Sequence, residues 1–424
     1  MNIADRTTLT MPGPVNAHSH AFHRLLRGRT HAGPHGAPGD FWRWREEMYR
    51  SAESLTPETM ERLATAVYAE MAAAGWTAVG EFHYLHHGLD GTPYGADDAG
   101  EHAMERALAR AARTVGLRLV LLDTCYLRGG LSPAGEQLEL SPVQRRYADA
   151  DVGAWASRWG RLRAALAEED AGAGLVSLGA AVHSLRAVDA GQLREIAGWA
   201  AEHPEVPLHI HLSEQPAENA AVQAAQGMSP TRLLHEHGLL SPRLSAVHAT
   251  HLSEEDVSLL GEARATVVMC PTTEADLGDG IGPARELADA GAVIALGSDQ
   301  HAVVDPFLEM RALEHGERLR SGERGRFSPA QLVRASSDAG RRSLGLPEDA
   351  AEAECADDAV VVDCSSARTA GGRPEQLALS ATAADVLSVR VGGEEIAREG
   401  RHLRLGDPAE LYHALFTDHP ELRS

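Results

Sequence analysis

The chain has 424 residues, of which 39 are basic and 61 acidic, giving a formal net charge of −22. This length suits one barrel-sized domain with a minor companion, and the acidity disfavours nucleic acid and anionic membrane surfaces as partners, because like charges repel. None of the basic residues is a lysine, which excludes Schiff-base chemistry, a P-loop lysine and a carbamylated-lysine metal bridge.

The cysteines and the N-terminus indicate the compartment. Cys125, Cys270, Cys355 and Cys364 form no CxxC pair, so they predict neither a zinc ribbon nor a thioredoxin motif. Scattered cysteines in a chain of this length are typical of reduced core residues in the cytoplasm. Met1–Thr10 lacks the apolar region of a signal peptide, and no run of 18 apolar residues occurs. We therefore expect a cytoplasmic protein with no membrane span.

Most of the chain alternates short apolar runs with longer amphipathic runs, which is typical of βα units around a parallel sheet. Helical patterns include Glu101–Val115, closed by Gly116, and Ala187–Glu202. No GxGxxG motif follows the first strand, which disfavours a dinucleotide-binding sheet. Eight strands predict an α/β fold, a (β/α)₈ TIM-type barrel. They are Val15–His20, Thr77–His83, Leu117–Cys125, Leu175–His183, Leu208–Ser213, Ser245–Ala249, Thr266–Cys270 and Val293–Asp299.

The pattern changes after Pro347. Asp358–Cys364 and Val386–Ile396 have the composition of strands, and Gly392-Gly393 inside the second run fits a hairpin turn. These runs predict a small all-β, sandwich-like second domain. Few residues precede the first barrel strand, so either this domain is reduced at its N-terminal side or the true start of the protein lies upstream. The predicted division is residues 15–349 for the barrel, and 1–14 together with 350–424 for the small domain.

Polar side chains gather at the C-terminal ends of the predicted strands, where barrels of this kind carry their active sites. Side chains alternate along a strand, so His18 and His20 should share one face while Ala17 and Ser19 share the other. By the same rule His209 and His211 face inward. We expect His209 to pack rather than to bind a ligand. Four further histidines should lie on the surface: His86, His87, His235 and His237.

Three histidines and one carboxylate from different strands form a set that suits zinc or another divalent transition metal, which would turn water into a nucleophile near neutral pH. His248 ends the sixth strand and Asp299 the eighth. Glu214, three residues after His211, can act as general acid and base without binding the metal. His248 could orient the attacked group, and Asp299 could both bind metal and accept a proton.

The order HxH, HxxE, His and GSD along the chain resembles the amidohydrolase superfamily. Longer segments resemble its formimidoylglutamate deiminase family, most specifically FWRWREEMYR (Phe41–Arg50), EFHYLHH (Glu81–His87) and CPTTEADLGDG (Cys270–Gly280). The resemblance spans roughly the first three quarters of the chain. The remaining matching segments are Asn16–Arg24, His183–Val188, His209–Gln215, Val247–Leu252 and Gly297–His301.

This resemblance implies hydrolysis of N-formimino-L-glutamate to N-formyl-L-glutamate and ammonia, a step of histidine degradation, by a homodimer with one zinc ion per subunit. The implied zinc ligands are His18, His20, His211 and Asp299. The implied catalytic residues are Glu214, His248 and Asp299.

The same resemblance implies a binding site for a small dicarboxylate. Arg45, Tyr84 and Arg186 would hold the two carboxylates, because a guanidinium pairs bidentately with a carboxylate. His183 would position the formimino group. Position 23 is His23, where the family often has glutamine, so its contact to that group stays open.

Three alternatives remain at the level of the sequence. Arg43 and Arg50 share the segment of Arg45 and could take its role. Another metal-dependent deaminase, acting on guanine, cytosine, adenosine or a triazine, would share the metal and acid residues but would not need the two arginines. A non-catalytic metal-binding barrel would not need Glu214.

Overall fold

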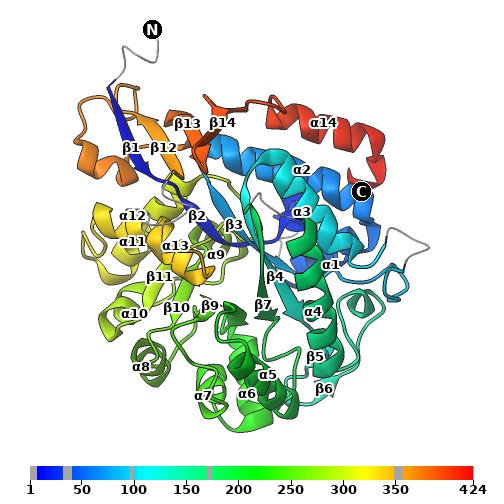
Figure 1. The fold of residues 1–424 in the computed structure, drawn as a ribbon. Coiled ribbons are helices and arrows are strands. Elements are labelled where there is room, and N and C mark those ends of the chain that lie inside the picture. The colour runs from blue at the N-terminus through cyan, green and yellow to red at the C-terminus, as the bar shows by residue number, and fades with distance from the viewer. Residues whose placement is uncertain (1–6, 32–40, 96–99, 170–173, 348–356, 424) are drawn as a thin grey trace.

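The computed structural model describes residues 7–31, 41–95, 100–169, 174–347 and 357–423. Its main sheet confirms all eight predicted strands, which run parallel and in chain order around the barrel (Figure 1). The strands are β2 (Val15–Ser19), β3 (Ala78–His83), β4 (Arg118–Cys125), β7 (Val176–Val182), β8 (Leu208–Leu212), β9 (Leu244–His248), β10 (Thr266–Met269) and β11 (Val293–Leu296).

The barrel closes where β11 meets β2. Ser19 and Asp299 form a parallel bridge, and the amides of Ser298 and Asp299 both donate to the carbonyl oxygen of His18, at 3.2 and 3.0 Å. The closure therefore brings the HxH segment of the first strand against the GSD segment that follows the last.

Helices surround the strands, and their ends follow local sequence signals. Thr56 caps α2 with Pro57 in its first turn, and Gly75 ends it with φ 112°. The helix after β7 begins later than the predicted Ala187, because Asp189 caps it and accepts from the amide of Gln192. The helices are α1 (Phe41–Ser54), α2 (Pro57–Ala74), α3 (Ala103–Val115), α4 (Val152–Glu169), α5 (Ala190–Glu202), α6 (Pro216–Gln226), α7 (Pro230–Glu236), α8 (Glu254–Glu262), α9 (Pro271–Leu277), α10 (Ala284–Ala290), α11 (Pro306–Ser321), α12 (Pro329–Ser336), α13 (Asp338–Ser343) and α14 (Pro408–Asp418).

One extra residue in β2 interrupts its pairing with β3, so that Ala17 and His18 together face Gly80. The prediction that Ala17 and Ser19 share the outer face is therefore wrong for Ala17, which packs inside the barrel with side chains of β9, β10 and β11. The bulge has a functional consequence, because it changes the direction in which the following side chains of the HxH segment point.

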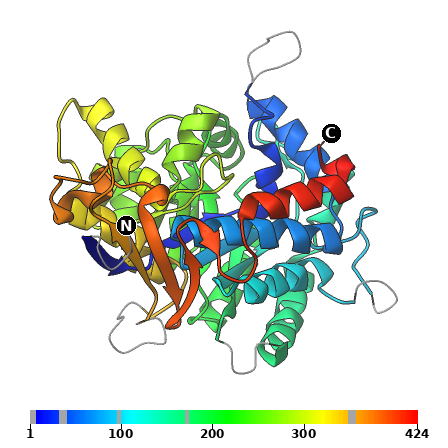
Figure 2. The ribbon, with the colours of Figure 1, turned by 90° about the horizontal axis from the view of Figure 1, so that it is seen from above.

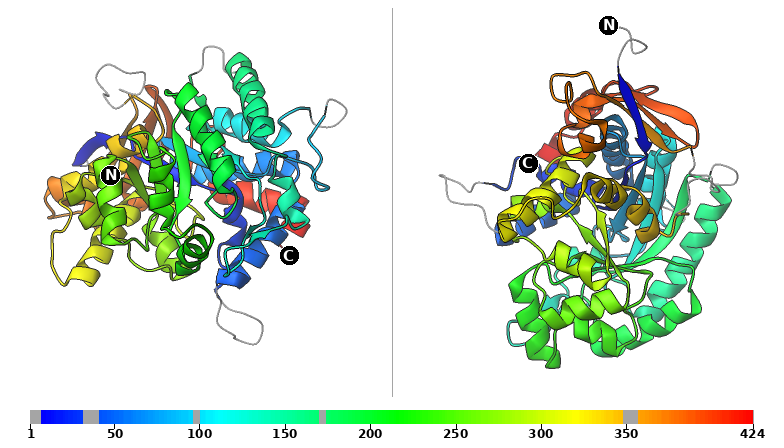
Figure 3. Two further views of the ribbon diagram at one scale, coloured as in Figure 1. Left: turned by 90° about the horizontal axis from the view of Figure 1, so that it is seen from below. Right: turned by 90° about the vertical axis from the view of Figure 1, so that its left-hand side faces the viewer.

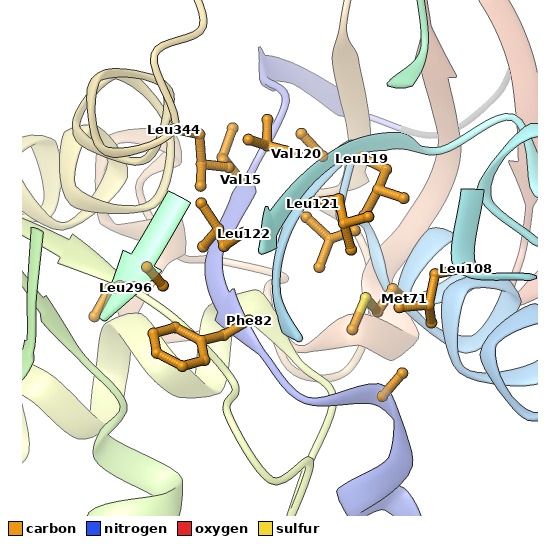
Figure 4. Packing of buried hydrophobic residues seen from close by; sticks show 14 of the residues in the cluster. Val15, Met71, Phe82, Leu108, Leu119, Val120, Leu121, Leu122, Leu296 and Leu344 are labelled. Carbon is orange, nitrogen blue, oxygen red and sulfur yellow. The ribbon is translucent and has the colours of Figure 1, made fainter. Parts of the chain in front are cut away.

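The N-terminal end of the barrel is closed by α13 and the residue after it. Leu344 lies beside Val15, Val120 and Leu122 (Figure 4). A Cβ atom on Gly80 would lie 2.4 Å from a methyl carbon of Leu344. A larger residue at position 80 would therefore push Leu344 away from the end of the barrel. Apolar closure of this end leaves the C-terminal end as the open face of the barrel.

A second, antiparallel sheet packs against α2, and the segment Pro374–Leu379 between two of its strands contacts α11 and α12 (Figures 2 and 3). The predicted hairpin is confirmed, with Gly392 at φ 58° and Gly393 at φ 80° in its turn. The exact domain boundaries stay a prediction. In sheet order its strands are β1 (Thr8–Pro12), β12 (Ala359–Asp363), β13 (Val386–Val391), β14 (Glu394–Arg398) and β15 (Arg401–His402).

Two further predictions concern covalent links and membranes. Cys125, Cys270 and Cys364 are free thiols, and Cys355 lies outside the described residues. Within the described residues, no helix has the length and apolar character needed to cross a membrane.

Candidate active site

Three imidazole nitrogens converge at the open end of the barrel. The Nε2 atom of His211 lies 3.2 Å from that of His18 and 3.3 Å from that of His20. Oδ1 of Asp299 lies 3.4 and 3.5 Å from the Nε2 atoms of His18 and His20. The structure thus brings together the four residues that the sequence resemblance assigns to a metal.

The hydrogen bonds behind these rings fix where their protons are. Nδ1 of His20 donates to the carbonyl of Phe82 at 2.7 Å, and Nδ1 of His211 donates to the carbonyl of His183 at 2.9 Å. Burial lowers the pKa of His20 and of His211 well below the usual value, so both rings are neutral. Their Nε2 lone pairs therefore point at a common centre.

The donor set fits a tetrahedral divalent metal. Zinc–nitrogen bonds of ~2.0–2.1 Å place tetrahedral ligand atoms about 3.3 Å apart, which is the spacing of these nitrogens. Burial would raise the pKa of Asp299, but the adjacent His18 and the other histidines hold it well below its usual value. Three neutral imidazoles and one carboxylate are the ligands that such an ion requires.

Three carboxylates surround His248 beside this centre. Its Nδ1 atom lies 3.3 Å from Glu274, and its Nε2 atom lies 3.9 Å from both Glu214 and Asp299. Burial alone would lower the pKa of His248, but the surrounding carboxylates, Glu214 first among them, raise it to about 10. His248 can therefore hold a proton between groups that accept one.

The backbone is strained at the strand ends that carry these groups. Ser213, His248 and Asp299 have φ of 51°, 68° and 43°, a region that residues other than glycine seldom adopt. Each such residue costs on the order of 1 kcal/mol and persists only where the surroundings enforce it. The strain lies at the turns that aim Glu214, His248 and Asp299 toward one another.

A cavity of about 240 Å³ opens onto this centre. It is smaller than the ~300–1,000 Å³ of sites for drug-sized ligands, so it suits a small metabolite. His18 lies behind the wall, whereas the other predicted site residues all line the cavity: His20, His23, Arg45, Tyr84, His183, Arg186, His211, Glu214, His248 and Asp299.

The structure distinguishes the three rival arginines of α1. Arg45 lines the cavity, and its guanidinium lies 5.2 Å from the centre of the Tyr49 ring. Arg43 is not among the lining residues, and Arg50 is exposed and pairs with Glu47. Arg45 and Arg186 are therefore the two arginines that the described part of the chain presents to this cavity.

Aromatic side chains form the wall between the histidines and α1. Tyr84 is 2% exposed, and its hydroxyl lies 3.0 Å from Nε2 of His23. The His23 ring is tilted by 40° against the His20 ring, with 4.4 Å between their centroids, and the Trp44 ring meets His23 edge-on. His23 thus lies beside His20, a predicted metal ligand. On the same wall, Nδ1 of His183 lies 3.1 Å from the hydroxyl of Ser184.

Sequence reasoning missed several residues of this site. Gln144 donates to the hydroxyl of Tyr126 at 2.7 Å, and both line the cavity under the short hairpin of β5 (Gly130–Leu131) and β6 (Gln137–Leu138). No motif marked these two side chains. Glu218 also lines the cavity. It follows Glu214 by four residues, and this spacing could have indicated that the two side chains lie close together.

The prediction that His86 and His87 lie on the surface is wrong, because they are 3% and 4% exposed. His86 contacts Glu105 through Nδ1 at 2.7 Å and the carbonyl of Thr124 through Nε2 at 2.9 Å. A buried arginine, Arg158, completes this network behind β3 and β4. Buried carboxylates thus account for the burial of these histidines.

The remaining histidine predictions divide as follows. His209 is buried, and its Nε2 atom donates to the carbonyl of Ser343 at 2.8 Å, which agrees with a packing role. His235 is exposed as predicted. His237 is half-buried, with its Nδ1 atom on the carbonyl of Leu233.

The chain belongs to the amidohydrolase family, whose model matches residues 9–396. A crystal structure of an amidohydrolase from Brucella melitensis superposes with a TM-score of 0.85 and 33% identity, covering 98% of this chain and 90% of that one. The geometry above is therefore that of a hydrolase acting on carbon–nitrogen bonds.

Within this family the chain is a homologue of formimidoylglutamate deiminase. The enzyme of that name from Pseudomonas aeruginosa is 37% identical over 406 residues, which cover 92% of this chain and 85% of that protein. An 8-oxoguanine deaminase of the same organism is 30% identical over 346 residues, covering 80% of this chain and 70% of that protein.

Proposed function

We propose that the protein hydrolyses N-formimino-L-glutamate to N-formyl-L-glutamate and ammonia, with one zinc ion per subunit. The observation that carries this proposal is a single small cavity that joins the histidine–aspartate centre to Arg45 and Arg186. The 37% identity to a formimidoylglutamate deiminase supports the same substrate. A cytoplasmic location and a homodimer, both expected from the sequence, are part of the proposal.

We assign the metal to His18, His20, His211 and Asp299. Zinc is favoured because imidazole and carboxylate donors at this spacing suit it. When bound, the ion supplies Lewis acidity that makes water a nucleophile near neutral pH.

The chain's own groups then move the protons. Asp299 faces the centre and accepts the proton of the attacking water. His248 already holds a proton, and Glu274 orients its ring through Nδ1, so His248 positions the attacked group. Attack at the formimino carbon forms a carbon–oxygen bond. Glu214, 3.9 Å from His248, passes the two protons of the water in turn to the formimino nitrogen. The carbon–nitrogen bond then breaks as the new carbonyl forms, and ammonia leaves.

The substrate's two carboxylates are assigned to the arginine end of the cavity. Arg45 and Arg186 offer guanidinium groups that pair with carboxylates, and the hydroxyl of Tyr84 adds a neutral donor. His183 and His23 lie between this end and the metal centre, where the formimino group would lie. A nucleobase offers no carboxylate to these arginines, which disfavours the alternative deaminases.

Ammonia release tests the proposal. Zinc-loaded protein is given N-formimino-L-glutamate, with guanine and cytosine in parallel assays. We expect release from the formimino compound alone. Release only from a nucleobase would overturn the substrate assignment, and metal binding without release from any of the three would favour a non-catalytic metal-binding barrel.

A further inference from the structure

Glu218 is a buried carboxylate in the cavity wall to which the proposed reaction gives no role. It is 2% exposed, lies in the first turn of α6, and follows Glu214 by four residues. Neither of its carboxylate oxygens has a hydrogen-bond partner among the described residues. A buried polar group without a partner costs on the order of 1–3 kcal/mol, so an interacting group must offset this cost.

The cation that faces Glu218 is Arg186. Its Nε atom lies 4.0 Å from Oε1 of Glu218 and likewise has no hydrogen-bond partner among the described residues. Both side chains line the cavity. Glu218 therefore stands on the Nε side of the guanidinium, which leaves the two terminal nitrogens for another acceptor.

We propose that Glu218 is a positioning residue that holds the Nε side of Arg186, so that the terminal nitrogens of the guanidinium bind a carboxylate of the substrate. This inference rests on the proposed function, which supplies a dicarboxylate substrate. Glu218 acts through Arg186 rather than on a reacting atom. Its removal should therefore weaken substrate binding and leave the chemical step nearly intact.

The charges of the pair agree with this arrangement. Burial would lower the pKa of Arg186, but Glu218 and Glu214, together with Tyr126 and Tyr49, outweigh burial and raise it. Burial raises the pKa of Glu218, and Arg186 offsets part of that rise. A substrate carboxylate would approach Arg186 from the end of the guanidinium opposite Glu218.

A double-mutant cycle tests the inference on zinc-loaded protein. Glu218→Ala should raise KM roughly tenfold with kcat changed by less than about threefold, whereas the same change in an Arg186→Gln background should cost no more than about twofold. Glu218→Gln, which keeps an acceptor oxygen, should restore most of the KM. Glu202→Ala, at the exposed end of α5, is the matched control and should change neither constant.

Other results of the cycle overturn the inference. Equal losses with and without Arg186 would mean that Glu218 acts independently. An unchanged KM, or a fall in kcat alone, would also contradict a positioning role.

Binding of glutarate, measured by calorimetry, separates this inference from the proposed reaction. If the wild type releases no ammonia but binds glutarate, and Glu218→Ala weakens that binding only when Arg186 is present, the reaction is wrong and the positioning role stands. If the wild type is active and Glu218→Ala keeps the wild-type KM and glutarate affinity, the positioning role is wrong and the reaction stands. Absence of both turnover and glutarate binding would overturn both.

Discussion

Two buried clusters of histidine and carboxylate lie on this barrel, one at its open end and one behind β3 and β4. In the first, His18, His20 and His211 direct their Nε2 atoms at one another over 3.2–3.3 Å. Backbone carbonyls already hold the protons of two of the rings at Nδ1. The Nε2 lone pairs of His20 and His211 repel each other at this distance, and a cation between the rings would remove that repulsion.

In the second cluster the cation is part of the chain. His83, His86 and Glu105 have donor atoms within 4.8 Å of one another, which is also compatible with a metal. However, the guanidinium of Arg158 lies 3.4 Å from Glu105 and 2.6 Å from Asp123. Each ring nitrogen of His86 contacts an acceptor, Glu105 at Nδ1 and the carbonyl of Thr124 at Nε2.

The comparison shows that histidine and carboxylate content does not define a metal centre. What distinguishes the two clusters is whether protons and guanidinium groups already balance the charge. Arg158 provides this balance in the second cluster, and in the first no arginine of the described residues contacts the ligand atoms. The predictions below test this distinction, from the largest expected effect to the smallest.

Removing one histidine from each cluster should have opposite results. His211→Ala deletes a ligand, so bound metal and ammonia release should both be lost, while His86→Gln should keep one equivalent of metal. Elemental analysis of purified, dialysed protein gives the metal content. Loss of metal in His86→Gln, with metal retained in His211→Ala, would reverse the assignment of the two clusters.

Glu214→Gln keeps the shape of the side chain but removes its proton-transfer chemistry. We expect kcat to fall by about 10²–10⁴-fold with the metal content unchanged, because that is the usual contribution of a positioned acid–base group. Steady-state ammonia release measures the effect, and Glu202→Gln on the protein surface is the control. Near-normal turnover of Glu214→Gln would rule out the role assigned to this residue.

Arg158→Met tests the second cluster. It leaves Asp123, Asp149 and Glu105 buried without their guanidinium, so we expect a loss of about 3–5 kcal/mol in unfolding free energy. Denaturant unfolding measures it. Arg161→Met on the same helix removes an exposed pair with Glu101 and should cost less than about 1 kcal/mol. Equal effects of the two variants would show that the network contributes little.

The second cluster should also make the fold sensitive to mild acid. Burial lowers the pKa of His83 and of His87 to about 4. The unfolded chain takes up these protons near pH ~6.5, so it binds more protons than the folded state between about pH 6.5 and 4. Stability from these residues is fully present above pH 6.5 and falls as the pH drops through this window.

Unfolding free energies at pH 7.5, 6 and 5 measure this dependence. His83→Gln should have a flatter profile than the wild type, because glutamine takes up no proton. Identical slopes would show that His83 does not contribute to the acid sensitivity.

The sequence predicted the eight barrel strands, and every residue to which it assigned a metal, acid or substrate role lines one cavity except His18, which lies behind the cavity wall. Strand periodicity and the position of polar residues at strand ends carry that information. Gln144 could not be predicted in this way, because it lies in the single short turn Val143–Arg146, which leaves no periodic signal. Tyr126 directly follows β4, but no motif marks it. The prediction that Ala17 points out of the barrel failed because one extra residue in β2 interrupts the regular alternation of side chains.

The surface prediction for His86 and His87 failed for a different reason. Histidine is often exposed, and nothing local to EFHYLHH shows that Glu105 and Arg158, which lie on α3 and α4, fold over it. Whether a charged side chain is buried depends on partners that are distant in the sequence. For the same reason the sequence did not predict the contact between Glu218 and Arg186.

Zinc titration of metal-free protein, followed by ammonia release from N-formimino-L-glutamate, tests the central claim most directly. If the open-end cluster is the metal centre and the second cluster is balanced by Arg158, activity should rise from zero and saturate at one equivalent of zinc per chain. Activity without metal, or saturation only at two equivalents, would contradict this account.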